Sequence, residues 1–266
     1  MKKWLGISLT LAVLLAALGA PWLAPHDPLR TDFPQSLRPP GAAGHPLGTD
    51  QLGRDLLARV LHGARLALFI GGCTVVLTAV VGGLLGLVAG FVERWPSTVL
   101  MRIVDVQLSF PFILLAMTIN AIVGLGLRNI ILSLSAAGWV VYARVVRGEV
   151  LSVKQRDYVQ AAAALGVGRT RLLFRHVLPN VAPSIIVVAS LQFSSFIVAE
   201  AAISFLGFGV QPPTPAWGSM LSESRDFLYV AWWLAAFPGA ALALTALGVN
   251  LLGDWLRDTL DPKLRV

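Results

Sequence analysis

The stretch YVQAAAALGVGRTRLLFRHVLPN, residues 158–180, separates two long apolar runs and decides how the rest of the chain is interpreted. Its first part carries a stripe of small apolar side chains at helical spacing: Tyr158, Ala161, Ala162 and Leu165. Gly166 and Gly168 then interrupt the helix, and leucine and valine alternate with basic residues until Pro179, where we expect the segment to end. The pattern predicts a helix, a turn and a second helix, too polar to cross a membrane and too regular for a linker.

The composition around this stretch is that of a membrane protein. The chain has 266 residues, of which 56% are hydrophobic and only 13% charged, about half the charge of an average soluble domain. Its apolar runs are continuous, which favours helices over a barrel, and a helix needs about 20 residues to cross a bilayer. We therefore predict an all-α integral membrane protein with six transmembrane helices, near 5–23, 66–91, 99–124, 130–150, 181–206 and 230–252.

The basic residues set the orientation. Six spans place both termini on one side, and a cytoplasmic N-terminus puts 14 of the 21 lysines and arginines inside and 7 outside. The positive-inside rule therefore favours termini that are both cytoplasmic, with 158–180 on the same side. The net charge of +7 follows from this loop asymmetry, so it does not indicate nucleic-acid binding.

The same spans divide the chain into regions. We expect a first transmembrane helix at 1–24, an extracytoplasmic segment with an amphipathic helix at 25–65, a core of five transmembrane helices at 66–253 and a cytoplasmic tail at 254–266. The core contains a cytoplasmic loop at 151–180 and an outer loop at 207–229. The first run also resembles a cleavable signal peptide, but it continues through Pro21 to Leu23, which favours a retained helix.

Motifs of enzyme chemistry are absent from the sequence. None of the lysines follows a glycine, so the chain has no phosphate-binding loop for ATP. Its histidines form no H-E-x-x-H pair, and Cys73 is a single cysteine inside a predicted span. We predict no catalytic residue, no metal site and no cofactor in this chain.

The pattern of 158–180 leaves two interpretations open. Its arginines are suited to anionic lipid headgroups, while its alanines permit close approach by another protein surface. Resemblance decides between them. Ala161-Ala162, Gly166 and Leu178-Pro179 match the "EAA" loop of binding-protein-dependent ABC importer permeases, with Gln160 where that pattern commonly has Glu.

Four further blocks extend the resemblance over most of the chain: HPLGTDQLGRDLLARVLHGARLAL (45–68), RIVDVQLSFPFILL (102–115), EAAISFLGFGVQPPTPAWGSML (200–221) and NLLGDWLRDTLDPKLR (250–265). They are similar to the second permease of dipeptide, oligopeptide and nickel importers.

The resemblance implies a type I ABC importer permease fold in a prokaryotic inner membrane. It implies as partners a second permease, two ATPase subunits that bind ATP and Mg²⁺, an extracytoplasmic substrate-binding protein and membrane lipid. The cargo it implies is a di- or oligopeptide, with nickel or another small solute as the alternative. A secondary transporter and a membrane scaffold are the alternatives from other classes. The residues that match the ATPase-docking loop are Gln160, Ala161, Ala162, Ala163, Leu165, Gly166 and Arg169.

Polar residues elsewhere are candidates for a pathway or gate. Glu200 and Asn120 lie within predicted spans, where a charge is costly, and each is also suited to a structural contact between helices. Trp217 follows a proline-rich outer run and is expected either at a gate or at the lipid headgroups. Two ion pairs are also expected from spacing, Asp55 with Arg59 and Arg102 with Asp105. Finally, Gly166 is expected to have positive φ.

Overall fold

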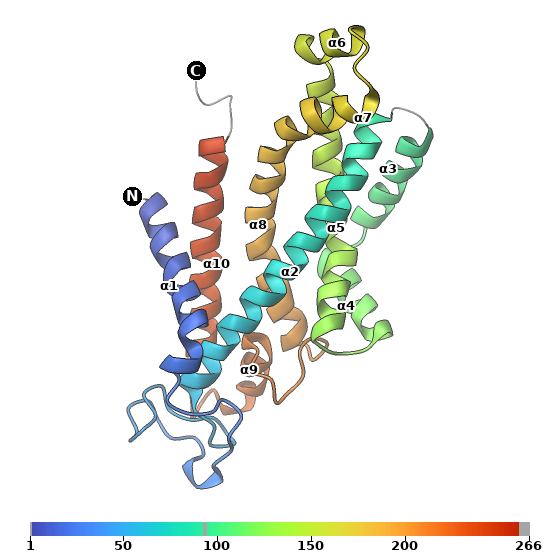
Figure 1. Cartoon of the computed structure of the whole chain (residues 1–266). Helices are drawn as coiled ribbons and strands as arrows, with labels where there is room; N and C mark the ends of the chain where they lie inside the picture. Colours follow the sequence, from blue (N-terminus) through green and yellow to red (C-terminus); the bar gives the residue numbers. More distant parts are fainter. Residues whose placement is uncertain (1, 93–94, 261–266) are drawn as a thin grey trace.

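The computed structural model describes residues 2–92 and 95–260, and its long elements are all helices (Figure 1). The long helices are α1 (Lys2–Leu23), α2 (Leu56–Phe91), α3 (Trp95–Leu108), α4 (Phe112–Val123), α5 (Leu127–Lys154), α8 (Leu178–Phe205) and α10 (Trp233–Leu260). Shorter elements are α6 (Asp157–Ala164), α7 (Arg169–Arg171), α9 (Trp217–Glu223), the 3₁₀ turns η1 (Phe33–Gln35) and η3 (Arg225–Phe227), and a π-helical turn η2 (Leu172–Val177). This confirms the all-α prediction.

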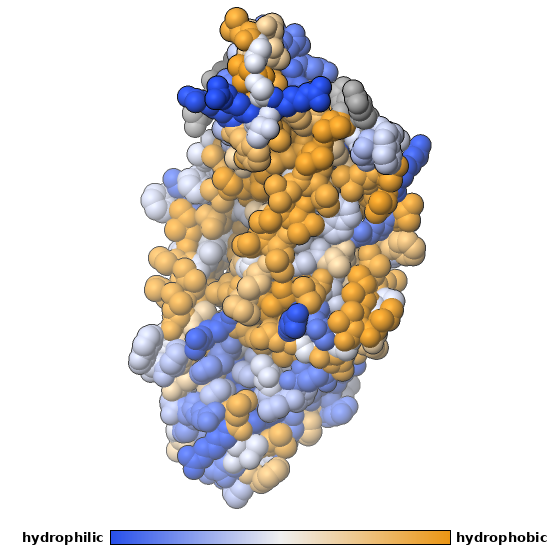
Figure 2. Space-filling model, turned by 45° about the vertical axis from the view of Figure 1, so that its right-hand side comes forward, coloured by the Kyte–Doolittle hydropathy of each residue, from blue (hydrophilic) through white to orange (hydrophobic). Residues whose placement is uncertain are grey.

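Six passages through the membrane are consistent with these helices. Five are long and apolar enough to cross on their own, and the bent pair of α3 and α4 gives the sixth when the pair is counted as one broken span. The start of α1, the end of α10 and α6 lie at one end of the bundle, and the segment between α1 and α2 lies at the other (Figure 1). A broad apolar belt separates two hydrophilic ends (Figure 2).

The third passage differs from the prediction of one continuous helix over 99–124. The axes of α3 and α4 meet at 94°. The break falls at Ser109, Phe110 and Pro111, and Pro111 caps the start of α4. Proline disfavours helical backbone in the residue before it, so α3 ends ahead of this point.

The second passage begins earlier than predicted. Asp55 caps α2 by accepting a hydrogen bond from the Ala58 amide, and the helix continues without a break to Phe91. The amphipathic helix expected within 25–65 is therefore not separate: residues 56–65 form the first turns of α2. The boundary drawn at residue 65 falls inside α2.

Glycines allow close contacts between helices in the bundle. Gly82, Gly86 and Gly90 lie along one face of α2 against α5, where the Gly86 Cα approaches the backbone of Ala143. At the other side of the bundle, α1 packs against α10 through Gly6 and Gly248. The first apolar run is thus packed into the bundle.

The predicted tail at 254–266 is partly helical. Residues 254–260 complete α10, and 261–266 lie outside the described residues.

Candidate functional site

The loop between α5 and α8 folds as a helix followed by a tight turn. Asp157 is the first residue of α6, and its carboxylate interacts favourably with the positive N-terminal end of the helix dipole. At the other end, the Val167 amide donates to the Ala162 carbonyl at 3.1 Å and the Gly166 amide donates to the Ala163 carbonyl at 3.0 Å. This is a Schellman cap, which requires the left-handed conformation at Gly166, where φ is +82°. The prediction of positive φ is confirmed.

An apolar cluster fixes α6 to the bundle. Val159 is 2% exposed and packs with Val153 of α5, Leu172 and Val177 of the second helical segment, and Leu87 of α2. Polar contacts add to this anchor, since Arg156 Nη1 donates to Asn180 Oδ1 at 3.3 Å. Movement of α6 must therefore also involve the ends of these helices.

The opposite face of α6 is exposed. Leu165 is 86% exposed and Tyr158 is 44% exposed, although both are apolar enough to favour burial. The loop residues predicted to dock an ATPase are all exposed except Ala162, which is half-buried: Gln160, Ala161, Ala163, Leu165, Gly166 and Arg169. Gln160 donates from its side chain to the Gln155 carbonyl at 3.3 Å. The structure thus brings the predicted residues together on α6, the turn after it and the start of α7.

The second half of the loop continues into the membrane without stopping. The π-helical turn η2 leads directly into α8, and Pro179 occupies the first turn of that helix. Proline has no amide hydrogen to donate, and the π-helical turn η2 lies directly before it. The expectation that Pro179 ends the segment is therefore wrong.

Three arginines lie in α7 and η2, just before this junction. Arg169, Arg171 and Arg175 are exposed and form no ion pair with another described residue. Figure 2 shows a strongly hydrophilic band at this end of the molecule, with an apolar tip beyond it. Figure 1 places α6 at that extreme end.

The three pathway or gate candidates lie away from this loop. Asn120 of α4 is fully buried and binds the Phe208 carbonyl and the Ser133 hydroxyl. Glu200 of α8 is 2% exposed and accepts a hydrogen bond from Ser204 Oγ at 2.6 Å. The Asn120 contacts join α4 to other elements, as the structural alternative expects, whereas the Glu200 contact stays within α8.

Trp217 is placed differently from the headgroup position expected for it. Its indole is 2% exposed, and Nε1 donates to the Val60 carbonyl of α2 at 3.0 Å. The side chain lies against Gly63, where any Cβ would approach the ring to 2.7 Å. Trp217 therefore joins α9 to α2, and the expectation of a headgroup anchor is wrong.

Sequence spacing missed a buried ionic cluster at the outer end. Arg54 Nε binds Asp50 Oδ2 at 2.6 Å, and Arg54 Nη2 binds Glu223 Oε2 at 3.1 Å. Arg59 binds the same two carboxylates at 3.5 Å. The predicted partner of Arg59 was Asp55, which is wrong because Asp55 caps α2. The i, i+4 spacing of Asp50 and Arg54 was the available signal, but Glu223 is too distant in sequence to be found this way.

The second predicted ion pair also has a different partner. Asp105 of α3 binds Arg144 of α5 instead of Arg102. The break between α3 and α4 leaves α3 beside α5, which brings these two side chains together.

Comparisons with known proteins agree with this architecture. Residues 82–266 match the family described as "Binding-protein-dependent transport system inner membrane component". The chain is 46% identical over 265 residues to the di/tripeptide transport system permease protein DppC of Pseudomonas aeruginosa, covering 98% of this chain and 88% of that protein. It is 44% identical to the dipeptide transport system permease protein DppC of Escherichia coli, over 98% of this chain and 88% of that protein.

A third relative has a different stated cargo. The chain is 40% identical to the glutathione transport system permease protein GsiD of Pectobacterium atrosepticum, over 100% of this chain and 89% of that protein. Matches of this length and identity cover the outer segment, the bundle and the α6 loop together. The chain is therefore a multi-pass inner membrane protein and belongs to the family of binding-protein-dependent transport system inner membrane components.

Proposed function

We propose that the chain is the permease subunit of an ATP-driven, binding-protein-dependent importer of di- or oligopeptides. The named cargoes of three relatives, which are dipeptides, di/tripeptides and the peptide glutathione, support this substrate class. A second permease would complete the pathway, and an external substrate-binding protein would deliver the peptide. Two ATPase subunits would bind ATP and Mg²⁺ on the cytoplasmic side.

The exposed face of α6 is the observation that carries the proposal. Leu165 and Tyr158 project from a helix whose other face is fixed by Val159. Alanines between them leave room for a partner's backbone to approach closely. An ATPase surface fits this face better than lipid does, because the apolar tip lies beyond the hydrophilic band and farther from the apolar belt (Figure 2).

The apolar cluster around Val159 would transmit movements of α6 to the membrane-spanning helices. Closure of two ATPase subunits would move α6, and the cluster around Val159 would pass the movement to α2, α5 and α8. The pathway would then alternate between inward-open and outward-open states. In this proposal the chain takes no part in ATP hydrolysis, and it changes conformation in response to it.

A site-specific crosslink tests the docking. Ala163→Cys in a Cys73→Ala background places one thiol on the exposed face of α6. With the ATPase coexpressed, we expect a crosslink to it whose yield changes when ATP is added. Thr259→Cys is the matched control, since it is also exposed at the cytoplasmic end but lies on α10.

The two outcomes separate the interpretations. An ATP-sensitive crosslink from Ala163→Cys, with a weak or ATP-independent one from Thr259→Cys, supports coupling through α6. A correctly inserted Ala163→Cys chain that crosslinks no better than the control contradicts the proposed docking surface.

A further inference from the structure

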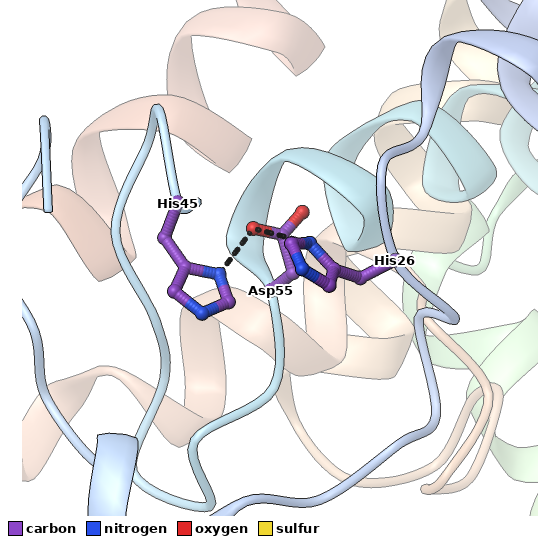
Figure 3. A group of neighbouring side chains, drawn as sticks. All are labelled: His26, His45 and Asp55. Atoms are coloured by element: carbon purple, nitrogen blue, oxygen red, sulfur yellow. Dashed lines mark hydrogen bonds and ion pairs between the residues drawn. The ribbon is translucent and has the colours of Figure 1, made fainter. Parts of the chain in front are cut away.

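Three side chains from separate segments meet at the outer end of the bundle. His26 follows α1, His45 lies in the turn closed by the Ala42–His45 bridge, and Asp55 caps α2 (Figure 3). The two imidazole rings stack with centroids 4.7 Å apart. Because these residues lie far apart in the sequence, no metal-binding spacing marks them.

We propose that His26, His45 and Asp55 bind a divalent transition-metal ion of the zinc class. His45 Nδ1 lies 2.8 Å and His26 Nδ1 lies 3.8 Å from Asp55 Oδ1, and one ligand atom from each residue lies within 4.8 Å of the others. Ligands of a tetrahedral zinc ion at about 2.0–2.1 Å are separated by about 3.3 Å. The two observed distances lie on either side of that value, so small side-chain rotations bring all three atoms into coordination.

The charge of Asp55 also points to a bound cation. Its side chain is fully buried. Oδ2 accepts the Ala58 amide at 2.8 Å, and Oδ1 lies 2.8 Å from His45 Nδ1, a hydrogen bond when that nitrogen carries its proton. The nearby guanidinium groups of Arg54 and Arg59 bind Asp50 and Glu223 instead. A buried carboxylate whose nearest basic groups are histidines, with no arginine or lysine among its ion-pair partners in the described residues, has no permanently charged partner, which is costly. An ion at Oδ1 would neutralise it.

His26 supplies a second, independent sign. Its Nδ1 is buried and has no hydrogen-bond partner among the described residues. Buried nitrogen atoms of this kind are normally bonded. In Figure 3 this atom and His45 Nδ1 both face the Asp55 carboxylate, so a metal ion between them would use the free lone pair.

Protonation of the histidines beside Asp55, without a metal ion, explains less of this geometry. A protonated His45 would bind Asp55 but leave His26 Nδ1 without a partner. Protonating both rings would stack two positive charges face to face at 4.7 Å. Metal ligation instead requires both imidazoles to be neutral, which suits the stacking.

The donor set selects the ion and suggests its role. Two imidazoles and one carboxylate suit Zn²⁺, with water as a fourth ligand. The ion would tie the end of α1 and the turn at His45 to the start of α2. It would therefore brace the outer segment, and the earlier expectation that the chain has no metal site would be revised.

Zinc titration of the chain tests the site. The chain, purified in detergent with its partner subunits after chelator treatment, is titrated with Zn²⁺ by calorimetry, and its thermal unfolding is followed with and without Zn²⁺. We expect one zinc ion bound per chain and a higher unfolding midpoint with zinc. His26→Gln should weaken binding at least about tenfold and remove the midpoint shift, because a protein ligand is lost.

His62→Gln is the matched control. His62 is a half-buried histidine near the same end, and its Nδ1 lies 2.9 Å from the Ala58 carbonyl within α2. This variant should bind zinc as the unaltered chain does. Asp55→Asn gives a second check, because asparagine preserves the helix cap but removes the anionic ligand. Equal zinc affinity in the unaltered, His26→Gln and Asp55→Asn chains, or no zinc binding in any of them, overturns the proposal.

Discussion

At the scale of single residues, Gly166 and Gly168 form a natural comparison. Both have open space around the position that a Cβ would occupy. They differ in backbone conformation, because Gly166 has φ of +82° while Gly168 is extended, with φ of −60° and ψ of 146°. A branched side chain is strained only at the first of these.

Gly166→Val should therefore uncouple transport. We expect about 1–3 kcal/mol of backbone strain, enough to displace the Schellman cap and the end of α6. Membrane insertion should be normal, and peptide uptake into cells should be lost. Gly168→Val should retain uptake, since valine favours extended backbone. Normal uptake by Gly166→Val would contradict the coupling role of this turn.

Residue conformations were predictable only where they depend on local sequence. The positive φ of Gly166 follows from a glycine after a short alanine helix, so it was predicted correctly. The partners of Trp217 and Arg59 were not, because Val60 and Glu223 are 157 and 164 residues away along the chain. Trp217 and Arg59 form hydrogen bonds with groups in distant segments, and a local sequence pattern does not show such partners.

At the scale of helices, the close contact between α2 and α5 depends on glycines in α2, which have no side chain. A Cβ on Gly86 would lie 2.7 Å from the Ala143 carbonyl oxygen and 2.9 Å from Val146 Cβ. On Gly83, a buried neighbour on the same helix, the nearest atom would be Ile185 Cδ1 at 3.8 Å. Alanine at position 86 would therefore clash with the backbone of α5, whereas alanine at position 83 would make an ordinary van der Waals contact.

Gly86→Ala should destabilise the bundle by about 1–3 kcal/mol, because α2 and α5 must move apart. Gly83→Ala should be neutral or slightly stabilising, since alanine is the better helix former. Thermal unfolding of both variants in the same detergent measures the difference. Equal midpoints would show that α2 and α5 do not pack as described.

The helices themselves were more predictable than their boundaries. Long apolar runs located every passage, but the break between α3 and α4 was missed, although Phe110-Pro111 marked it. The merger of the outer helix with α2 was also missed. The first turns of α2 carry a polar residue, Arg59, because its guanidinium binds Asp50 and Glu223, which lie outside the helix.

At the scale of the whole molecule, this ionic cluster joins the outer segment to the bundle. Asp50 lies before α2, Arg59 lies within it and Glu223 ends α9. The side chains of Asp50, Arg54 and Arg59 are 4%, 3% and 1% exposed, so solvent screens these charges little.

Asp50→Asn should therefore destabilise the folded chain by about 3–5 kcal/mol, because it leaves two buried guanidinium groups with one carboxylate. Asn retains the acceptor for the Leu52 and Arg54 amides, so the loss reports on charge. Asp226→Asn, at an exposed position near Glu223, should change stability by less than about 0.5 kcal/mol. Thermal unfolding in detergent compares them, and similar midpoints would contradict a stabilising role for the cluster.

The unbroken course of α2 makes one long lever of this helix. Its 36 residues extend about 54 Å at 1.5 Å per residue. One end holds Arg59, and at the other Lys154 Nζ donates to the Phe91 carbonyl at 3.2 Å. Because α2 has no break between these ends, a tilt of its cytoplasmic end must also displace its outer end. Under the proposed function, nucleotide binding inside and peptide delivery outside would therefore act on opposite ends of one rigid helix.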